Sequence, residues 1–203
     1  AAARIAILDP ELTMTQPANV TSHTGIDALS HAIETSVTTK RTGTSYQYSK
    51  LAFELLNASF ELALKDPKNI EARSKMLLGA AYAGTAIESS MLGAAHAAAN
   101  PLTAQFGIIH GVAVGLMLPH VIKYNSEDPD IKKIYDDLYS GDLPKRVVEL
   151  LVLSGISSNL TSYGVDKANV ESLSKDASNQ WTGTFNPRGV GEGDFADLYE
   201  SAF

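Results

Sequence analysis

The amino-acid sequence predicts an all-α protein that folds as a multi-helix bundle. Apolar residues recur three and four positions apart through most of the chain, which is the spacing of helices that bury one face. Only residues 4–8, "RIAIL", have the β-branched composition of a strand, and Asp9 and Pro10 stop that run at once. Because a single strand cannot form a sheet, we expect helices to supply the core.

The predicted helices follow one another along the chain. Ser22 or Thr24 can cap the first helix, which carries Ile26, Leu29 and Ile33 on one side. Helical apolar patterns then cover residues 45–65, 70–93, 110–123, 131–139, 143–153 and 169–179, and a last helix begins near residue 193.

Small residues and prolines modify this pattern. The segment 70–93 is rich in Gly and Ala, which allow close helix packing and favour a central position. Pro101 is predicted to end or kink the Ala-rich segment before it, and Pro119 to bend the helix over residues 110–123.

Composition disfavours several classes of function. The chain has 203 residues, of which 44% are hydrophobic, and a formal net charge of −7. It contains no run of Lys or Arg, which argues against a nucleic-acid partner. No apolar segment is long enough to cross a bilayer, and the opening "AAARIAIL" is too short for a secretory signal. We therefore expect a cytoplasmic protein that has no membrane partner.

Four side chains have the chemistry of a metal site. Asp27 and His31 are four positions apart, so one helical face presents both, with Cβ atoms about 5–6 Å apart. His96 lies in an Ala-rich segment, and a loop can bring His110, fourteen positions later, back to it. One carboxylate and three imidazoles suit Zn²⁺ or Fe²⁺, and the absence of cysteine excludes thiolate ligands.

Structural interpretations of the same residues stay open at this point. An Asp–His pair on a helix is more often a hydrogen-bonded pair than a metal site, and His96 can be a core histidine with a satisfied partner. Two further histidines are not expected to be ligands: His23, predicted as a surface or capping group before the first helix, and His120, predicted as structural.

Longer motifs resemble the iron-containing (group III) alcohol dehydrogenase family. The segment "TGIDALSHAIE" at residues 24–34 is similar to the family's hallmark, and residues 94–125, "AAHAAANPLTAQFGIIHGVAVGLMLPHVIKYN", to its second signature. The segments "DPELT" and "WTGTFNPR" resemble further landmarks. The resemblance covers most of residues 5–125 and resumes near the C-terminus.

The resemblance implies a dehydroquinate synthase-like, all-helical C-terminal domain. In the family, one Asp and three His hold a divalent metal there, and the matching positions are Asp27, His31, His96 and His110. Residues 1–8 would then be the end of an interdomain strand or linker, and 9–203 the metal-binding domain. The family's N-terminal NAD(P)-binding domain would be absent from this sequence.

The resemblance also implies a reaction. NAD or NADP exchanges a hydride with a small alcohol or aldehyde, while Fe²⁺ or Zn²⁺ polarises the substrate oxygen. The chain has no "GGGS"-type phosphate turn, and "GVGEGD" at residues 189–194 lacks the last Gly of a dinucleotide motif. We therefore expect NAD(P) to bind poorly and the isolated chain to be weakly active or inactive. A homodimer agrees with the family.

Two further positions are site candidates by resemblance. Asn100 stands where many relatives carry a catalytic His near the nicotinamide, and it cannot titrate near neutral pH. It is equally well interpreted as a helix C-terminal residue before Pro101. Trp181 lines the substrate pocket in one interpretation and anchors the C-terminal tail in the other. Arg188 in "NPR" is expected to pair with an acidic group.

Two other functions compete with the dehydrogenase. The first is a stand-alone helical metal-binding or interaction module without dehydrogenase activity, which Asn100 and the absence of a cofactor domain favour. The second is metal-assisted hydrolysis, because three His and one Asp can leave a position for water. It ranks last because the sequence shows no distinctive general base near the four ligands.

Overall fold

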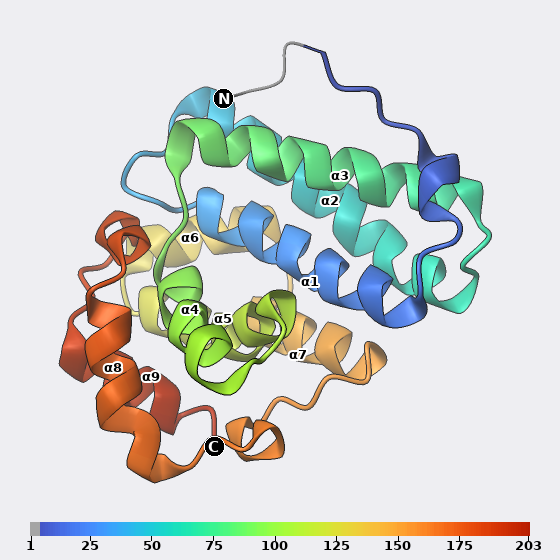
Figure 1. The fold of residues 1–203 in the computed structure, drawn as a ribbon. Coiled ribbons are helices and arrows are strands. Elements are labelled where there is room, and N and C mark those ends of the chain that lie inside the picture. The colour runs from blue at the N-terminus through green and yellow to red at the C-terminus, as the bar shows by residue number, and fades with distance from the viewer. Residues whose placement is uncertain (1–4) are drawn as a thin grey trace.

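The described part of the chain, residues 5–203 of a computed structural model, contains α-helices and short 3₁₀ helices and no strand (Figure 1). The α-helices are α1 (Ala18–Thr35), α2 (Gly43–Lys65), α3 (Ile70–Ser90), α4 (Ala94–Phe106), α5 (His110–Asn125), α6 (Pro129–Leu138), α7 (Leu143–Leu153), α8 (Val170–Ser178) and α9 (Glu192–Glu200). The 3₁₀ helices are η1 (Pro10–Thr13), η2 (Leu160–Tyr163), η3 (Lys167–Asn169) and η4 (Trp181–Phe185). The predicted all-α class is confirmed.

Helix α1 has a central place in this arrangement (Figure 1). It packs against the α2–α3 pair on one side and against α5 on the other, and α4 pairs with α5. Helices α8 and α9 pack on each other, with α8 against α4, while α7 packs against α5. Ile26, Leu29 and Ile33 of α1 are fully buried, so the predicted apolar side of this helix faces the core.

Side-chain caps explain where several helices begin. Thr42 Oγ1 accepts a hydrogen bond from the Ser45 amide at the start of α2, and Asn69 Oδ1 accepts one from the Ala72 amide at the start of α3. These caps satisfy amide donors that have no partner inside the first helical turn. At the C-terminal end of α4, Gly107 adopts a φ of 66°, a left-handed conformation that ends the helix.

The predicted strand is wrong over residues 5–8, which have no regular structure; residue 4 lies outside the described range. Ile5 and Ile7 are 83% and 89% exposed. The physical reason is that a strand needs a partner for its backbone groups, and residues 5–203 contain no second strand. The division of the chain at residue 8 stays a prediction.

Several helix boundaries also differ from the prediction. Helix α1 begins at Ala18, so Ser22 and His23 lie inside it, and the Ser22 hydroxyl donates to the Asn19 carbonyl instead of capping. Helix α4 continues through Pro101 to Phe106. Proline removes one helical hydrogen bond, yet the residues around Pro101 are buried, and this packing holds the helix together.

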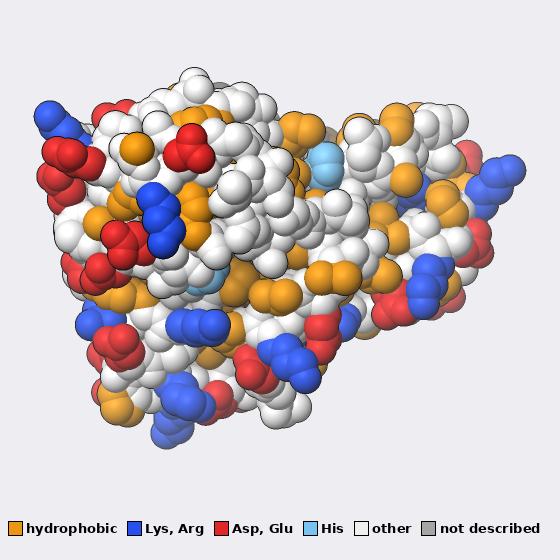
Figure 2. Space-filling model, turned by 90° about the horizontal axis from the view of Figure 1, so that it is seen from below, with side chains coloured by type: hydrophobic (Ala, Val, Ile, Leu, Met, Phe, Trp, Pro, Cys, Tyr) orange, Lys and Arg blue, Asp and Glu red, His pale blue; other side chains and the backbone are white. Residues whose placement is uncertain are grey.

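The surface seen in Figure 2 carries charges of both signs, scattered among apolar side chains. No broad basic patch of the kind that binds nucleic acid is visible on this face. Among the helices described, none combines the length and the apolar character needed to cross a membrane.

Candidate metal centre

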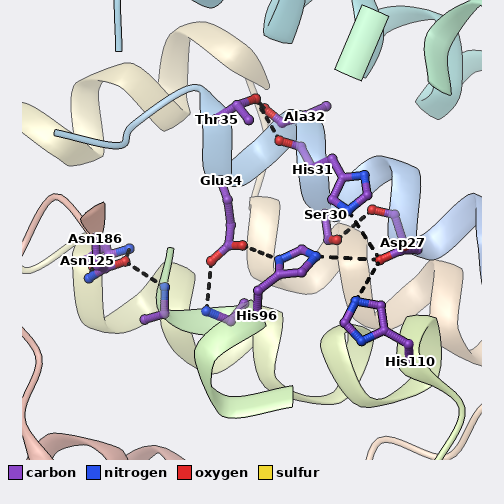
Figure 3. Close-up of polar contacts among 12 residues, drawn as sticks. Asp27, Ser30, His31, Ala32, Glu34, Thr35, His96, His110, Asn125 and Asn186 are labelled. Atoms are coloured by element: carbon purple, nitrogen blue, oxygen red, sulfur yellow. Dashed lines mark hydrogen bonds and ion pairs between the residues drawn. The ribbon is translucent and has the colours of Figure 1, made fainter. Parts of the chain in front are cut away.

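Helix α1 supplies two of the four predicted metal ligands. Asp27 and His31 are one turn apart, and their side chains point to the same side of the helix (Figure 3). The local geometry of a helix is sufficient for this, because positions i and i+4 share a face.

The other two candidates come from neighbouring helices, and glycines allow the approach. His96 is the third residue of α4, and His110 is the first residue of α5. A Cβ atom added to Gly111 would lie only 2.1 Å from the His23 carbonyl oxygen, so only glycine lets the start of α5 approach α1 this closely. This contact places His110 beside Asp27 (Figure 3).

The four side chains meet at one oxygen atom. Imidazole Nε2 atoms surround Asp27 Oδ1 at 3.5 Å (His31), 3.6 Å (His96) and 3.7 Å (His110). Four ligands held at about 2.1 Å from one ion in tetrahedral geometry lie about 3.4 Å apart, close to these separations. The ligand atoms of Asp27, His96 and His110 all lie within 4.8 Å of one another, whereas His31 is near Asp27 but is not part of this set.

Two atoms of this cluster have unmet bonding capacity. Asp27 Oδ1 and His96 Nε2 are buried and have no hydrogen-bond partner among the described residues. Buried polar atoms are nearly always paired, since leaving one unpaired costs about 1–3 kcal/mol. A cation between them would satisfy both, and the N/O donor set suits Zn²⁺ or Fe²⁺. The residues present therefore fit a divalent metal.

The surroundings of the cluster shift the pKa values of its members. Burial lowers the pKa of His31 to about 4, although Asp27 opposes that shift. Burial also acts to lower the pKa of His96, but the Glu34 carboxylate and Asp27 outweigh it and raise this pKa to about 9. Burial acts to raise the pKa of Asp27, and contact with His96 and the other imidazoles brings it below its usual value. Asp27 is therefore ionised at neutral pH, as a metal ligand must be.

Glu34 is the site residue that sequence reasoning missed. Its Oε2 lies 2.5 Å from His96 Nδ1, and its Oε1 accepts a hydrogen bond of 2.7 Å from the Ala95 amide (Figure 3). The available signal was its place three positions after His31 on α1. That position alone does not separate a buried carboxylate from the many Glu residues that face solvent.

Comparison with known proteins identifies the family. Residues 21–203 match the model described as Fe-containing alcohol dehydrogenase family, C-terminal. The chain belongs to the Fe-containing alcohol dehydrogenase family. The resemblance inferred from the two long motifs is thereby confirmed.

Individual members of the family agree with this assignment. The long-chain-alcohol dehydrogenase 1 of Geobacillus thermodenitrificans is 33% identical over 217 residues, covering 99% of this chain and 54% of the relative. The iron-containing alcohol dehydrogenase from Thermococcus thioreducens has a similar structure, with a TM-score of 0.89 and 27% identity over 97% of this chain and 54% of that one.

Another similar structure was solved with a cofactor. The sulfoacetaldehyde reductase from Bifidobacterium kashiwanohense, in complex with NAD⁺, has a TM-score of 0.88 and 25% identity, over 96% of this chain and 53% of that one. This chain thus spans about half the length of most of the curated relatives that it matches.

The other two residues predicted for the active site of this chain, Asn100 and Trp181, lie outside the cluster of predicted metal ligands. Asn100 Nδ2 donates to Gln180 Oε1 at 2.9 Å, and its interpretation as a helix C-terminal residue is wrong because α4 continues to Phe106. Trp181 is 60% exposed, and its ring lies 5.7 Å from that of Phe185 in an edge-to-face contact. The roles of Asn100 and Trp181 in catalysis and substrate binding stay predictions.

The expected partner of Arg188 is found. Its guanidinium lies 2.8 Å from Glu127 and stacks over the Tyr124 ring at 3.8 Å. It also donates to the Tyr124 carbonyl oxygen, so it ties the C-terminal segment to the end of α5. His120 has no contact with the four-ligand cluster among the interactions described, in keeping with a structural role.

Proposed function

We propose that this chain is the metal-binding part of an NAD(P)-dependent alcohol dehydrogenase, and that Asp27, His31, His96 and His110 are the metal ligands. The observation that supports this most strongly is the convergence of three imidazole nitrogens on Asp27 Oδ1 at 3.5–3.7 Å. Family membership supports the same reaction class.

The ligand residues define the direction from which a substrate reaches the site. The His96 side chain is almost completely buried, whereas the His110 side chain is 41% exposed. The centre is therefore closed on the α4 side and open at the start of α5. A divalent cation bound here would act as a Lewis acid on the oxygen of an alcohol or aldehyde while hydride passes between the substrate and nicotinamide.

The chain's own residues prepare this site before any substrate binds. Asp27 stays ionised, and its carboxylate faces His31, His96 and His110 from the middle of the cluster. Because these groups belong to three helices that pack together, their positions do not depend on a mobile loop. Metal centres bind strongly when the ligands are held in place in this way.

Metal analysis tests the ligand assignment. We expect the wild-type chain to retain about one Zn²⁺ or Fe²⁺ per molecule after dialysis, and the His96→Ala and His110→Ala variants to retain almost none. A His120→Ala variant is the matched control, because this imidazole lies away from the cluster, and it should retain as much metal as the wild type. Equal metal content in all four proteins would contradict the assignment.

A second experiment separates the dehydrogenase from a metal-binding module without activity. The metal-loaded chain is joined to the NAD(P)-binding half of a relative, such as the Geobacillus thermodenitrificans enzyme, and NAD(P)H oxidation is followed with short aldehydes. We expect turnover from the fusion and little or none from the chain alone. A fusion that holds metal and cofactor but has no turnover would favour the module.

A further inference from the structure

Glu34 is buried, with 3% of its surface exposed, and both of its carboxylate oxygens are in use. Oε2 contacts His96 Nδ1, and Oε1 accepts the Ala95 amide hydrogen at the start of α4. We propose that Glu34 is a positioning residue, which holds the His96 ring in the one tautomer and orientation that can bind a metal through Nε2. This inference rests on the proposed metal centre and deepens it.

The argument follows from the two ring nitrogens of His96. A carboxylate can only accept hydrogen bonds, so Nδ1 must carry a hydrogen to interact with Glu34. A metal binds the neutral ring, in which Nε2 then has a free lone pair. This atom lies 3.6 Å from Asp27 Oδ1 without a partner of its own among the described residues. A carboxylate behind a metal-bound histidine fixes the ring and makes the nitrogen more basic.

The second contact of Glu34 fixes the backbone next to the same ligand. Gly93, the residue before α4, has no side chain to cap the helix, and the Ala95 amide is bonded by Glu34 instead. A Cβ atom added to Gly93 would lie 3.0 Å from Glu34 Oε1, so glycine leaves room for this carboxylate. Glu34 thus holds the ring and the helical turn that carries it.

A neighbouring residue separates ring positioning from simple helix capping. Asn186 Oδ1 accepts a hydrogen bond of 3.3 Å from the Ala94 amide, one residue before the amide that Glu34 binds. None of the hydrogen bonds of Asn186 involves His96. If Glu34 served only as a cap for α4, loss of either side chain would affect metal binding to a similar extent.

The substitution Glu34→Gln has the same shape but the wrong hydrogen-bonding pattern. If the oxygen of the new side chain accepts the backbone N–H of Ala95, its NH₂ group must face His96 Nδ1. Nδ1 then has to accept this hydrogen bond, so the ring hydrogen moves to Nε2. If the side-chain amide is flipped, its NH₂ group faces the backbone N–H of Ala95, and two donors then oppose each other. The first orientation keeps both contacts but places a hydrogen on Nε2, the ligand atom, and the second loses the hydrogen bond to Ala95.

The experiment is a Co²⁺ titration of the full chain, followed by visible absorbance and compared among wild type, Glu34→Gln and Asn186→Ala. We expect Glu34→Gln to weaken Co²⁺ binding about 10–100-fold and to reduce the absorbance at saturation, because one imidazole no longer coordinates. Asn186→Ala should bind within about threefold of the wild type with an unchanged spectrum. If Glu34→Gln does not fold, Glu34→Asp replaces it, with the same expected loss because its oxygens are withdrawn by one methylene.

Two results would overturn the inference. If Glu34→Gln binds Co²⁺ within about threefold of the wild type, or if Asn186→Ala weakens binding equally, Glu34 is no more than a structural cap, and the metal centre still stands. If the wild-type chain binds no Co²⁺, the metal centre itself is wrong and the role of Glu34 falls with it.

Discussion

Two buried polar clusters lie on either side of the first turn of α4, and they differ in how far their hydrogen bonds are satisfied (Figure 3). The metal-centre cluster contains Asp27 and His96, which face each other with buried atoms that lack partners among the described residues. The amide cluster contains Asn125 and Asn186. Their side chains bond each other at 2.7 and 3.2 Å, and Asn186 also bonds Ala94 and the Arg188 carbonyl.

The difference is the one expected between the proposed metal site and a structural clamp. In the amide cluster, each side-chain atom has a protein partner, so the cluster joins α4, the end of α5 and the C-terminal segment without any ligand. In the metal-centre cluster, polar atoms are brought together without satisfying one another, which costs stability unless something binds. Substitutions should therefore affect metal binding in the first cluster and folding in the second.

The largest effect is expected for His110→Ala, measured by urea unfolding with and without Zn²⁺. At a Zn²⁺ concentration of about 100 times the wild-type Kd, bound metal should add about 2.7 kcal/mol to the free energy of unfolding. If the variant binds about 100-fold more weakly, the gain falls to about 0.4 kcal/mol. Metal-free stability should change little, because the His110 imidazole lies 3.7 Å from Asp27 Oδ1, beyond hydrogen-bond distance. If Zn²⁺ raised the free energy of unfolding equally in both proteins, the proposed difference between the two clusters would be wrong.

The converse effect is expected for Asn186→Ala in the amide cluster. The variant leaves the Ala94 amide and Asn125 Oδ1 without their buried partner, and we expect the free energy of unfolding to fall by about 2 kcal/mol. Urea unfolding of the metal-free protein measures this loss. A stability within about 0.5 kcal/mol of the wild type would show that this cluster is not a clamp.

A smaller effect is expected at Met91, between the end of α3 and the start of α4. Met91 has a φ of 67° and a ψ of −179°, a conformation that suits glycine and strains other residues. Met91→Gly should raise the free energy of unfolding by about 1 kcal/mol, the relief of strain less the greater flexibility of the unfolded chain. A decrease on thermal or urea unfolding would mean that the Met91 side chain contributes more by packing than its backbone loses by strain.

The smallest effect concerns His120, an imidazole outside both clusters. Burial and the nearby Lys123 lower its pKa from 6.5 to about 4. The unfolded chain therefore binds a proton first as the pH falls, so this histidine reduces stability progressively below pH 6.5 and the loss levels off near pH 4. Because the side chain is partly exposed, we expect about 1 kcal/mol at pH 5.

The control for this pH dependence is His120→Gln. Between pH 7 and pH 5, the wild type should lose about 1 kcal/mol more of its unfolding free energy than the variant. Identical pH profiles in urea unfolding would show that His120 does not contribute to the acid sensitivity of the fold.

The sequence alone determined most of the helices and one half of the metal-centre cluster. The 143–153 helix was predicted with the bounds that the structure has, and Asp27 and His31 share a face because four positions make about one helical turn. Hydrogen bonding and apolar periodicity within a helix are local properties, which a sequence displays directly. The family motifs added His96 and His110 as candidates.

Only the tertiary structure decided how these pieces meet. Which atom of Asp27 faces His96 and His110 depends on the contact between α1 and α5 at Gly111, and the role of Glu34 depends on where α4 begins. The continuation of α4 through Pro101 and the lack of regular structure over residues 5–8 also depend on packing partners. Such contacts join residues far apart along the chain, so no local pattern records them.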